Sequence, residues 1–364
     1  MPGRSAPEIT AARTRRVVVS GSHDIVRLVR KIDIFNHIYP PAYYARLMQV
    51  APDYKDIGKR MRGIPMLADL DVRFRVMDTF DDYQQVLSLP TPPIENIVDG
   101  EAASDLARAA NDGMAELVAR YPQRFPGFVA AVSYHDPDAA VREAVRAIDD
   151  LGARGIQMFT NARGTPISAP AYVPIFEALA SRDLPIWLHP YRGADVADFK
   201  GEDRSQYEIW WTFGWPYETS AAMARLVFAG HFDRFPALKV ITHHMGAMAP
   251  YFAGRVGPGW DQLGARTSGE DLSAVLGTLK KRPLDYFKMF YADTALFGAY
   301  DATVCGLAFF GAGHVLFASD APFDPEKGPM YIRETIAIID RLPISSEERE
   351  RIYWRNAAAL LKLS

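Results

Sequence analysis

Four short segments each end an apolar, strand-like run with a side chain that can bind a metal. Imidazole and carboxylate groups are the usual ligands of zinc and of several other divalent metals. When such residues close successive parallel strands of a (β/α)8 barrel, they meet at the mouth where barrel active sites lie. The pattern therefore predicts one shared metal site, although each residue taken alone could be structural. The segments are 31–37, 184–189, 238–244 and 314–320, ending in His37, His189, His244 and Asp320.

The elements that must position these residues alternate regularly along the chain. Runs that are apolar throughout are typical of parallel strands buried on both faces, and amphipathic helical stretches separate them. Eight such strands favour a single α/β domain, a (β/α)8 TIM barrel, over an open doubly wound sheet. No Gly-x-Gly-x-x-Gly motif follows the first strand, which argues against a dinucleotide fold. The expected strands lie at 31–36, 73–78 or 83–89, 127–133, 155–160, 185–189, 238–243, 287–292 and 314–319.

The barrel domain is expected to span residues 31–364. Residues 1–30 are interpreted as an N-terminal leader and arm, with a small hairpin leading into the first strand. Residues 40–72 are interpreted as an insertion after the first strand, near the mouth. Neither a domain-breaking linker nor an internal repeat is evident in the sequence.

Composition excludes several classes of function. The net charge of −3 offers no basic surface for nucleic acid or for membrane phosphates. No uninterrupted apolar stretch approaches the roughly 20 residues that cross a bilayer. A single cysteine, Cys305, excludes a disulfide framework and fits a reducing compartment, so we expect a cytoplasmic protein.

Several motifs resemble those of one known family. The chain is similar to the amidohydrolase-2 branch of the amidohydrolase superfamily, which includes the aminocarboxymuconate-semialdehyde, γ-resorcylate and 5-carboxyvanillate decarboxylases. The resemblance implies a (β/α)8 barrel with one divalent metal (Zn or Mn, with Fe as a further candidate) and no organic cofactor. It also implies non-oxidative decarboxylation of an aromatic or unsaturated carboxylic acid. The motifs lie at 32–40, 155–161, 216–219, 232–239, 244–246 and 319–322.

The resemblance also implies roles for individual residues. His37, His189 and Asp320 match metal ligands, while His244 matches a histidine that acts on metal-bound water or protonates the substrate carbon. A further ligand should fall at position 35, where this chain has Phe35, whose ring carries no donor atom. The remaining set of two histidines and one carboxylate leaves open positions, as in zinc sites with bound water or in octahedral Mn and Fe(II) sites.

His243 precedes the strand-six histidine and is a second candidate on that strand. It could supply a replacement ligand for the one missing at Phe35. Neighbouring residues on a regular strand point to opposite faces, so only one of His243 and His244 should face the mouth unless the strand ladder breaks there.

The rest of the expected pocket is aromatic, with one cation and one further carboxylate. Trp211 and Trp215, in the loop after the fifth strand, are predicted to form a lid or wall for a flat substrate, to which Phe35 would add a face. Arg255 could bind a substrate carboxylate through two hydrogen bonds, or could instead pair with Asp261 or Glu270. Asp293, at the end of the seventh strand, is expected to orient His244 or to touch the substrate.

Four functions remain open. The first, which the resemblance implies, is a metal-dependent carbon–carbon lyase, a decarboxylase in which His244 donates a proton. The second is a hydrolase of an amide, ester or lactone, in which metal-bound water attacks with His244 or Asp320 as base. A non-haem Fe or Mn oxygenase is the third, and a non-catalytic partner subunit is the fourth. We expect a small carboxylic acid as substrate and a homodimer or larger assembly, which could include a paralogous subunit.

Overall fold

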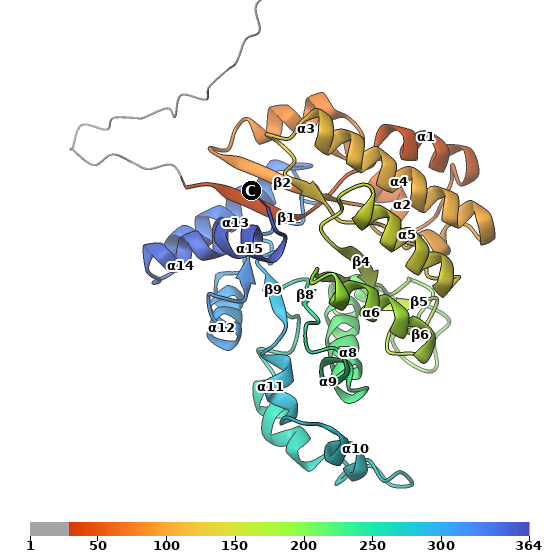
Figure 1. Ribbon diagram of the computed structural model, residues 1–364, viewed down its shortest axis with the longest axis vertical. Helices are drawn as coiled ribbons and strands as arrows, with labels where there is room; N and C mark the ends of the chain where they lie inside the picture. The colour runs from red at the N-terminus through yellow and green to blue at the C-terminus, as the bar shows by residue number, and fades with distance from the viewer. Residues whose placement is uncertain (1–28, 364) are drawn as a thin grey trace, which may run out of the picture.

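The computed structural model describes residues 29–363, which form a (β/α)8 barrel (Figure 1). Each of its eight strands lies within or overlaps an expected strand, and the second strand, Tyr83–Ser88, corresponds to the expected range 83–89. The 73–78 alternative is wrong, because that segment falls almost entirely within helix α3 (Leu70–Met77). The barrel strands are β1 (Lys31–His37), β2 (Tyr83–Ser88), β3 (Gly127–Phe128), β4 (Ile156–Phe159), β7 (Ile186–His189), β8 (Val240–Thr242), β9 (Tyr291–Asp293) and β10 (Val315–Leu316).

All paired barrel strands are parallel, and backbone hydrogen bonds close the ring. Strands β1, β2 and β3 form one run, and β4, β7, β8, β9 and β10 form the other. A parallel bridge between Ala130 and Ile156 joins the runs on one side. On the other side the backbone amide of Asp320 donates to the carbonyl of Phe35 at 2.9 Å. The last strand therefore lies beside the first, which brings together residues almost 300 positions apart.

Helices cover the outside of the barrel, as the amphipathic stretches predict (Figure 1). The start of α5 is set by Asp136, whose carboxylate accepts from the amides of Asp138 and Ala139. A capping box between Ser345 and Glu348 starts α14 in the same way. The covering helices are α4 (Gly100–Arg120), α5 (Pro137–Asp149), α6 (Val173–Ser181), α8 (Gly214–Phe228), α12 (Tyr300–Phe310), α13 (Pro329–Arg341), α14 (Ser346–Glu350) and α15 (Asn356–Leu360).

The barrel interior below the mouth is filled by apolar side chains. Trp187 of β7 is fully buried there, and its indole Nε1 donates to the carbonyl of Ile34 across the barrel at 3.1 Å. Side chains from β1, β2, β8 and β10 pack around it, including Ile32, Val86 and Ile241. The packed floor leaves the strand ends as the place where polar groups can collect.

Two insertions depart from a plain barrel. After β1 the chain forms α1 (Pro41–Val50), α2 (Ile57–Met61) and α3 near the mouth. After β8 a longer extension carries α10 (Ser273–Thr278) and α11 (Pro283–Phe287), and it projects away from the barrel (Figure 1). The remaining elements are short: the hairpin β5 (Asn161–Ala162) and β6 (Thr165–Pro166), and helices α7 (Ile209–Thr212) and α9 (His231–Arg234).

The expected N-terminal leader and nearly all of the expected arm lie outside the described residues. Within the described part of the chain, no helix combines the length and the hydropathy that crossing a membrane requires.

Candidate active site

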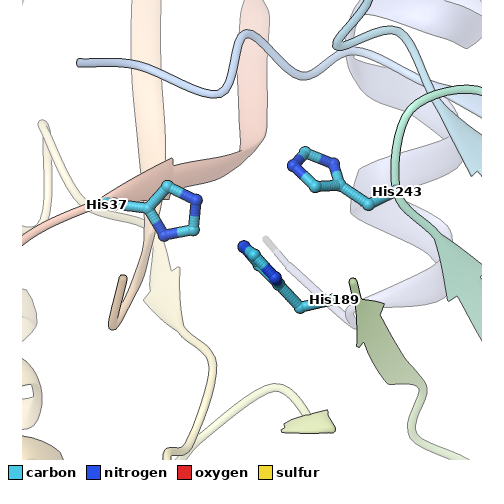
Figure 2. A group of neighbouring side chains, drawn as sticks. All are labelled: His37, His189 and His243. Atoms are coloured by element: carbon cyan, nitrogen blue, oxygen red, sulfur yellow. The ribbon is translucent and has the colours of Figure 1, made fainter. Parts of the chain in front are cut away.

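Three buried histidines converge at the mouth of the barrel. His37 ends β1, His189 ends β7 and His243 directly follows β8, so three different strands position them (Figure 2). One ring nitrogen from each lies within 4.8 Å of the other two. Asp320, which follows β10, adds a carboxylate whose Oδ1 is 3.0 Å from Nε2 of His37 and 3.5 Å from Nε2 of His243.

The outer nitrogen of each ring is held by an acceptor. Nδ1 of His37 lies 3.3 Å from the carbonyl of Leu89, and Nδ1 of His189 lies 2.6 Å from the carbonyl of Pro190. Nδ1 of His243 lies 2.5 Å from Oδ2 of Asp293. Carbonyl and carboxylate oxygens only accept, so Nδ1 is the donor in each ring and Nε2 is left facing the centre.

This donor set fits a divalent metal. Nε2 of His243 is fully buried and has no hydrogen-bond partner among the described residues. Leaving a buried polar atom unsatisfied is costly, and a bound cation among the inward nitrogens and the Asp320 carboxylate removes that cost.

His243 and His244 both face the mouth because the strand ladder ends before them. The ladder of β8 stops at Thr242, and His244 has a φ of 55°, which begins a left-handed run of four residues. The turn stacks the two imidazoles with centroids 3.7 Å apart. Nε2 of His244 then lies 3.6 Å from Oδ2 of Asp320. The strand ladder therefore breaks at this point, which is the condition under which both His243 and His244 could face the mouth.

Asp293 holds His243 rather than the ring of His244. Its Oδ2 accepts from Nδ1 of His243, and its Oδ1 accepts from the backbone amides of His244 at 3.0 Å and Ala295 at 3.1 Å. Asp293 therefore contacts His244 through its backbone amide and not through its ring, and a contact of Asp293 with the substrate stays a prediction.

Burial and charge divide the protons unequally within the cluster. Burial lowers the pKa of His37 and lowers that of His189 further, which keeps both imidazoles neutral. Burial also acts against the charge on His243, but Asp293 and Asp320 outweigh it and raise the pKa of His243 to about 9. Asp320 keeps a pKa well below its usual range despite burial, because His243, His244 and His37 stabilise its charge. Neutral imidazole and ionised carboxylate are the forms that bind metals, so His37, His189 and Asp320 are already in that form, whereas His243 must lose a proton when it binds one.

Phe35 lies among the three histidines. Its ring centroid is 4.1 Å from that of His243, 5.2 Å from that of His37 and 5.6 Å from that of His189. The side chain is only 1% exposed, so it packs against the histidine rings and offers almost no surface that a substrate could contact.

Of the two tryptophans named from the sequence, one borders the cluster. The ring of Trp215 is 5.8 Å from that of His189, and its Nε1 donates to the carbonyl of Arg192 at 3.2 Å. Trp211 is 40% exposed and its Nε1 donates to Glu208, so it lies apart from the histidines.

Three more aromatic rings border the histidines and were missed in the sequence. Phe159 lies 5.0 Å from His189, Phe323 lies 5.2 Å from His37 and Phe297 lies 5.3 Å from His244. All three lie at or just beyond a strand end, so the rule that located the ligands could have located them too.

The structure does not bring Arg255 to the cluster. Its exposed guanidinium lies over the ring of Phe252, and it lines a pocket of about 930 Å³ beside α8 that includes no histidine among the described residues. The alternative partner Asp261 is paired with Arg282 at 2.5 Å. Arg60, on α2 of the first insertion, instead donates to the carbonyl of Phe323 at the mouth.

A buried polar network supports β1 beneath the site. Arg73 of α3 donates to the carbonyl of His37, and at 2.7 Å to Oε1 of Gln85. Asp33 accepts from Tyr83 Oη at 2.6 Å and from Ser319, the residue before Asp320. Burial raises the pKa of Asp33 to about 6. Arg73 and Asp33 thus hold the ends of β1 and β10 in the positions that the ligands need.

Comparison with known proteins places the chain in a family. The sequence profile described as Amidohydrolase matches residues 32–363. The chain belongs to the amidohydrolase family. Within it, the γ-resorcylate decarboxylase of Polaromonas sp. (strain JS666) is 31% identical over 324 residues, covering 86% of this chain and 91% of that protein.

Solved structures of amidohydrolase relatives share the barrel. The 5-carboxyvanillate decarboxylase of Sphingomonas paucimobilis superposes with a TM-score of 0.76 at 26% identity, covering 92% of this chain and all of that one. A dihydroxybenzoic acid decarboxylase from Polaromonas sp. JS666, with bound manganese and the inhibitor 2-nitroresorcinol, gives a TM-score of 0.74 at 29% identity and covers 92% and 97% of the two chains.

Proposed function

We propose that this amidohydrolase is a metal-dependent decarboxylase, a carbon–carbon lyase that acts on an aromatic carboxylic acid. The observation that carries the proposal is the buried cluster of inward-facing histidine nitrogens and the Asp320 carboxylate, bordered by aromatic rings at the barrel mouth. The similarity to decarboxylases over most of the chain supports the same reaction class.

One divalent metal would be held by His37, His189 and Asp320. Manganese in the dihydroxybenzoic acid decarboxylase supports Mn, and the histidine-rich set suits Zn or Fe as well. When bound, such an ion polarises the substrate's carboxylate or a neighbouring oxygen. The side chains themselves place the substrate and move the proton.

His244 is the proposed proton donor. Its Nε2 is buried, has no hydrogen-bond partner among the described residues, and lies next to the Asp320 carboxylate. Burial and the adjacent His243 lower the pKa of His244, so its protonated form is a stronger acid than free imidazole. It would protonate the ring carbon that bears the carboxylate, after which carbon dioxide leaves and aromaticity is restored.

The aromatic border suits a flat substrate. Trp215, from the start of α8, and three phenylalanines at or beyond strand ends contact the histidines, so a ring inserted between them would be largely desolvated; the phenylalanines are Phe159, Phe297 and Phe323. For the substrate carboxylate, Arg60 at the mouth is better placed in this chain than Arg255.

The test is carbon dioxide release from a panel of hydroxybenzoates and muconate-like acids, measured with protein of known metal content. We expect release in the metal-replete protein and its loss in His189→Ala, with His135→Ala, a histidine outside the cluster, as the matched control. Hydrolysis of esters or lactones without carbon dioxide release would instead indicate the hydrolase alternative, and oxygen consumption the oxygenase. Metal-free protein that stays inert after reconstitution would indicate a non-catalytic subunit.

We also propose that residues 31–364 act as one catalytic domain within a cytoplasmic homo-oligomer. Tyr217, Tyr251 and Phe213 expose more than half of their side-chain surface around α8 and the following extension. Exposed aromatic side chains of this kind are enriched at interfaces between subunits.

A further inference from the structure

Position 35 provides no ligand, yet its side chain packs directly against the histidine cluster. The ring of Phe35 contacts all three inward histidines and has only carbon atoms to offer. A metal at this mouth must therefore take its donors from the residues around Phe35. His37, on the same strand, and the residues of neighbouring strands are the sources available.

Of the three histidines, His243 has the ring closest to that of Phe35. Its ring is 4.1 Å from that of Phe35, and its ligand atom lies within 4.8 Å of those of His37 and His189. Its Nε2 is also 3.5 Å from Oδ1 of Asp320, which makes His243 a member of both potential ligand groups in the described chain.

The surroundings of His243 hold its ring in an orientation suited to binding a metal through Nε2. Nδ1 is held at 2.5 Å by Asp293, whose other oxygen is anchored on two backbone amides. A carboxylate on one nitrogen of a histidine typically orients the ring and raises the basicity of the other nitrogen toward a metal. That other nitrogen, Nε2, is buried and has no hydrogen-bond partner among the described residues.

His244 also has a buried Nε2 without a hydrogen-bond partner among the described residues, but it differs from His243 in how its ring is held. No carboxylate holds its ring, since Asp293 reaches only its backbone amide. Its Nε2 lies 3.6 Å from Oδ2 of Asp320, so it shares a group with His243 and Asp320, but it is outside the group formed by His37, His189 and His243. The adjacent histidine is therefore a matched control of the same chemistry.

We propose that His243 is a metal ligand that takes over the coordination position that Phe35 cannot fill. The set then consists of the imidazoles of His37, His189 and His243 with the carboxylate of Asp320. This inference rests on the metal site of the proposed function and adds a ligand to it. A set with three imidazoles and one carboxylate favours Zn over Mn more strongly than a set with two carboxylates.

The test measures metal affinity by chelator competition, independently of activity, in the wild type, His243→Asn and His244→Asn. Asparagine at 243 keeps a donor for Asp293 but lacks Nε2, so the fold is preserved, which thermal unfolding checks. We expect His243→Asn to weaken Zn affinity more than about 100-fold, beyond the loss that removal of an outer partner of a ligand causes. His244→Asn should stay within about threefold.

A second experiment moves the ligand from position 243 to position 35. In the double variant Phe35→Glu, His243→Asn, a carboxylate at position 35 should restore metal binding and lower the ratio of Zn to Mn affinity by about tenfold relative to the wild type. Two results would overturn the inference while leaving the metal site intact. One is a ratio of Zn to Mn affinity in the double variant that equals the wild-type ratio, and the other is a Zn affinity of His243→Asn within threefold of the wild type. Wild-type protein that takes up no metal refutes the proposed site itself, so the two failures are distinguishable.

Discussion

Asp293 is the residue whose smallest change should have the clearest effect on the site. In the native protein the backbone amides of His244 and Ala295 donate to Oδ1 of Asp293 at 3.0 and 3.1 Å. In Asp293→Asn the side-chain amide oxygen can accept these two hydrogen bonds. The amide NH2 then faces Nδ1 of His243. That nitrogen must accept instead of donate, so the proton moves to Nε2 and occupies the lone pair that faces the centre.

The expected magnitude follows from that change of tautomer. Losing the partner that holds a metal-bound histidine weakens metal affinity about 10- to 100-fold, or roughly 1.4 to 2.7 kcal/mol. The buried hydrogen bond to a charged acceptor contributes about 1.5 to 3 kcal/mol, part of which the amide retains, so unfolding stability should fall by less than about 3 kcal/mol. The pKa of His243 should also fall, since Asp293 is the main group that raises it against burial.

Chelator competition measures the affinity, and urea unfolding of the metal-free protein measures the stability. Asp261→Asn, which removes a carboxylate from an exposed pair with Arg282, is the control and should change neither. Asp293→Asn that binds metal within twofold of the wild type would refute the reasoning, because the carboxylate would then not determine which nitrogen of His243 carries the proton.

Two further predictions test the pocket and the pH dependence of folding. Trp215→Leu should raise KM for an aromatic acid about 10-fold or more, since the ring borders His189, whereas Trp211→Leu should change KM less than twofold; steady-state kinetics of both variants checks this. His231 packs against Phe176, and burial, aided by Arg234, lowers its pKa to about 4. Because the unfolded chain takes up that proton near pH 6.5, the stability that neutral His231 contributes should be fully present above that pH and fall by about 3 kcal/mol as pH drops toward 4. Urea midpoints across this range should fall more in the wild type than in His231→Leu, and an equal fall in both proteins would contradict the assignment.

Much of the fold could be predicted because its signals are local. Apolar runs that end at His37, His189 and Asp320 identify strands and the direction in which they lead, and parallel strands of a barrel must bring those ends to one face. The error over 73–78 has a local cause as well. Val72, Phe74 and Val76 alternate with arginines as in a strand, but Asp69 caps this segment as a helix and Arg73 is buried under β1.

The contents of the site could be predicted less well than its position. Arg255 was a candidate for binding a substrate carboxylate or for pairing with Asp261 or Glu270, but the chain after His244 leaves the barrel in an extension and carries Arg255 away from the histidines. Arg60 carries no signal in the sequence that sets it apart, yet the first insertion folds back so that its guanidinium reaches the carbonyl of Phe323. Both outcomes depend on loop paths that spacing along the chain does not determine.

The sequence by itself determined the barrel, the family resemblance, the face where chemistry occurs and the absence of a donor at Phe35. Periodicity and residue type are enough for these, because each depends on neighbours along one strand. Only the tertiary structure decided which histidine compensates. The left-handed run that begins at His244 turns both histidines toward the mouth, and Asp293, from the next strand, holds His243 there. Such a choice depends on backbone torsion and on a contact between strands, and neither is written in the spacing of the residues.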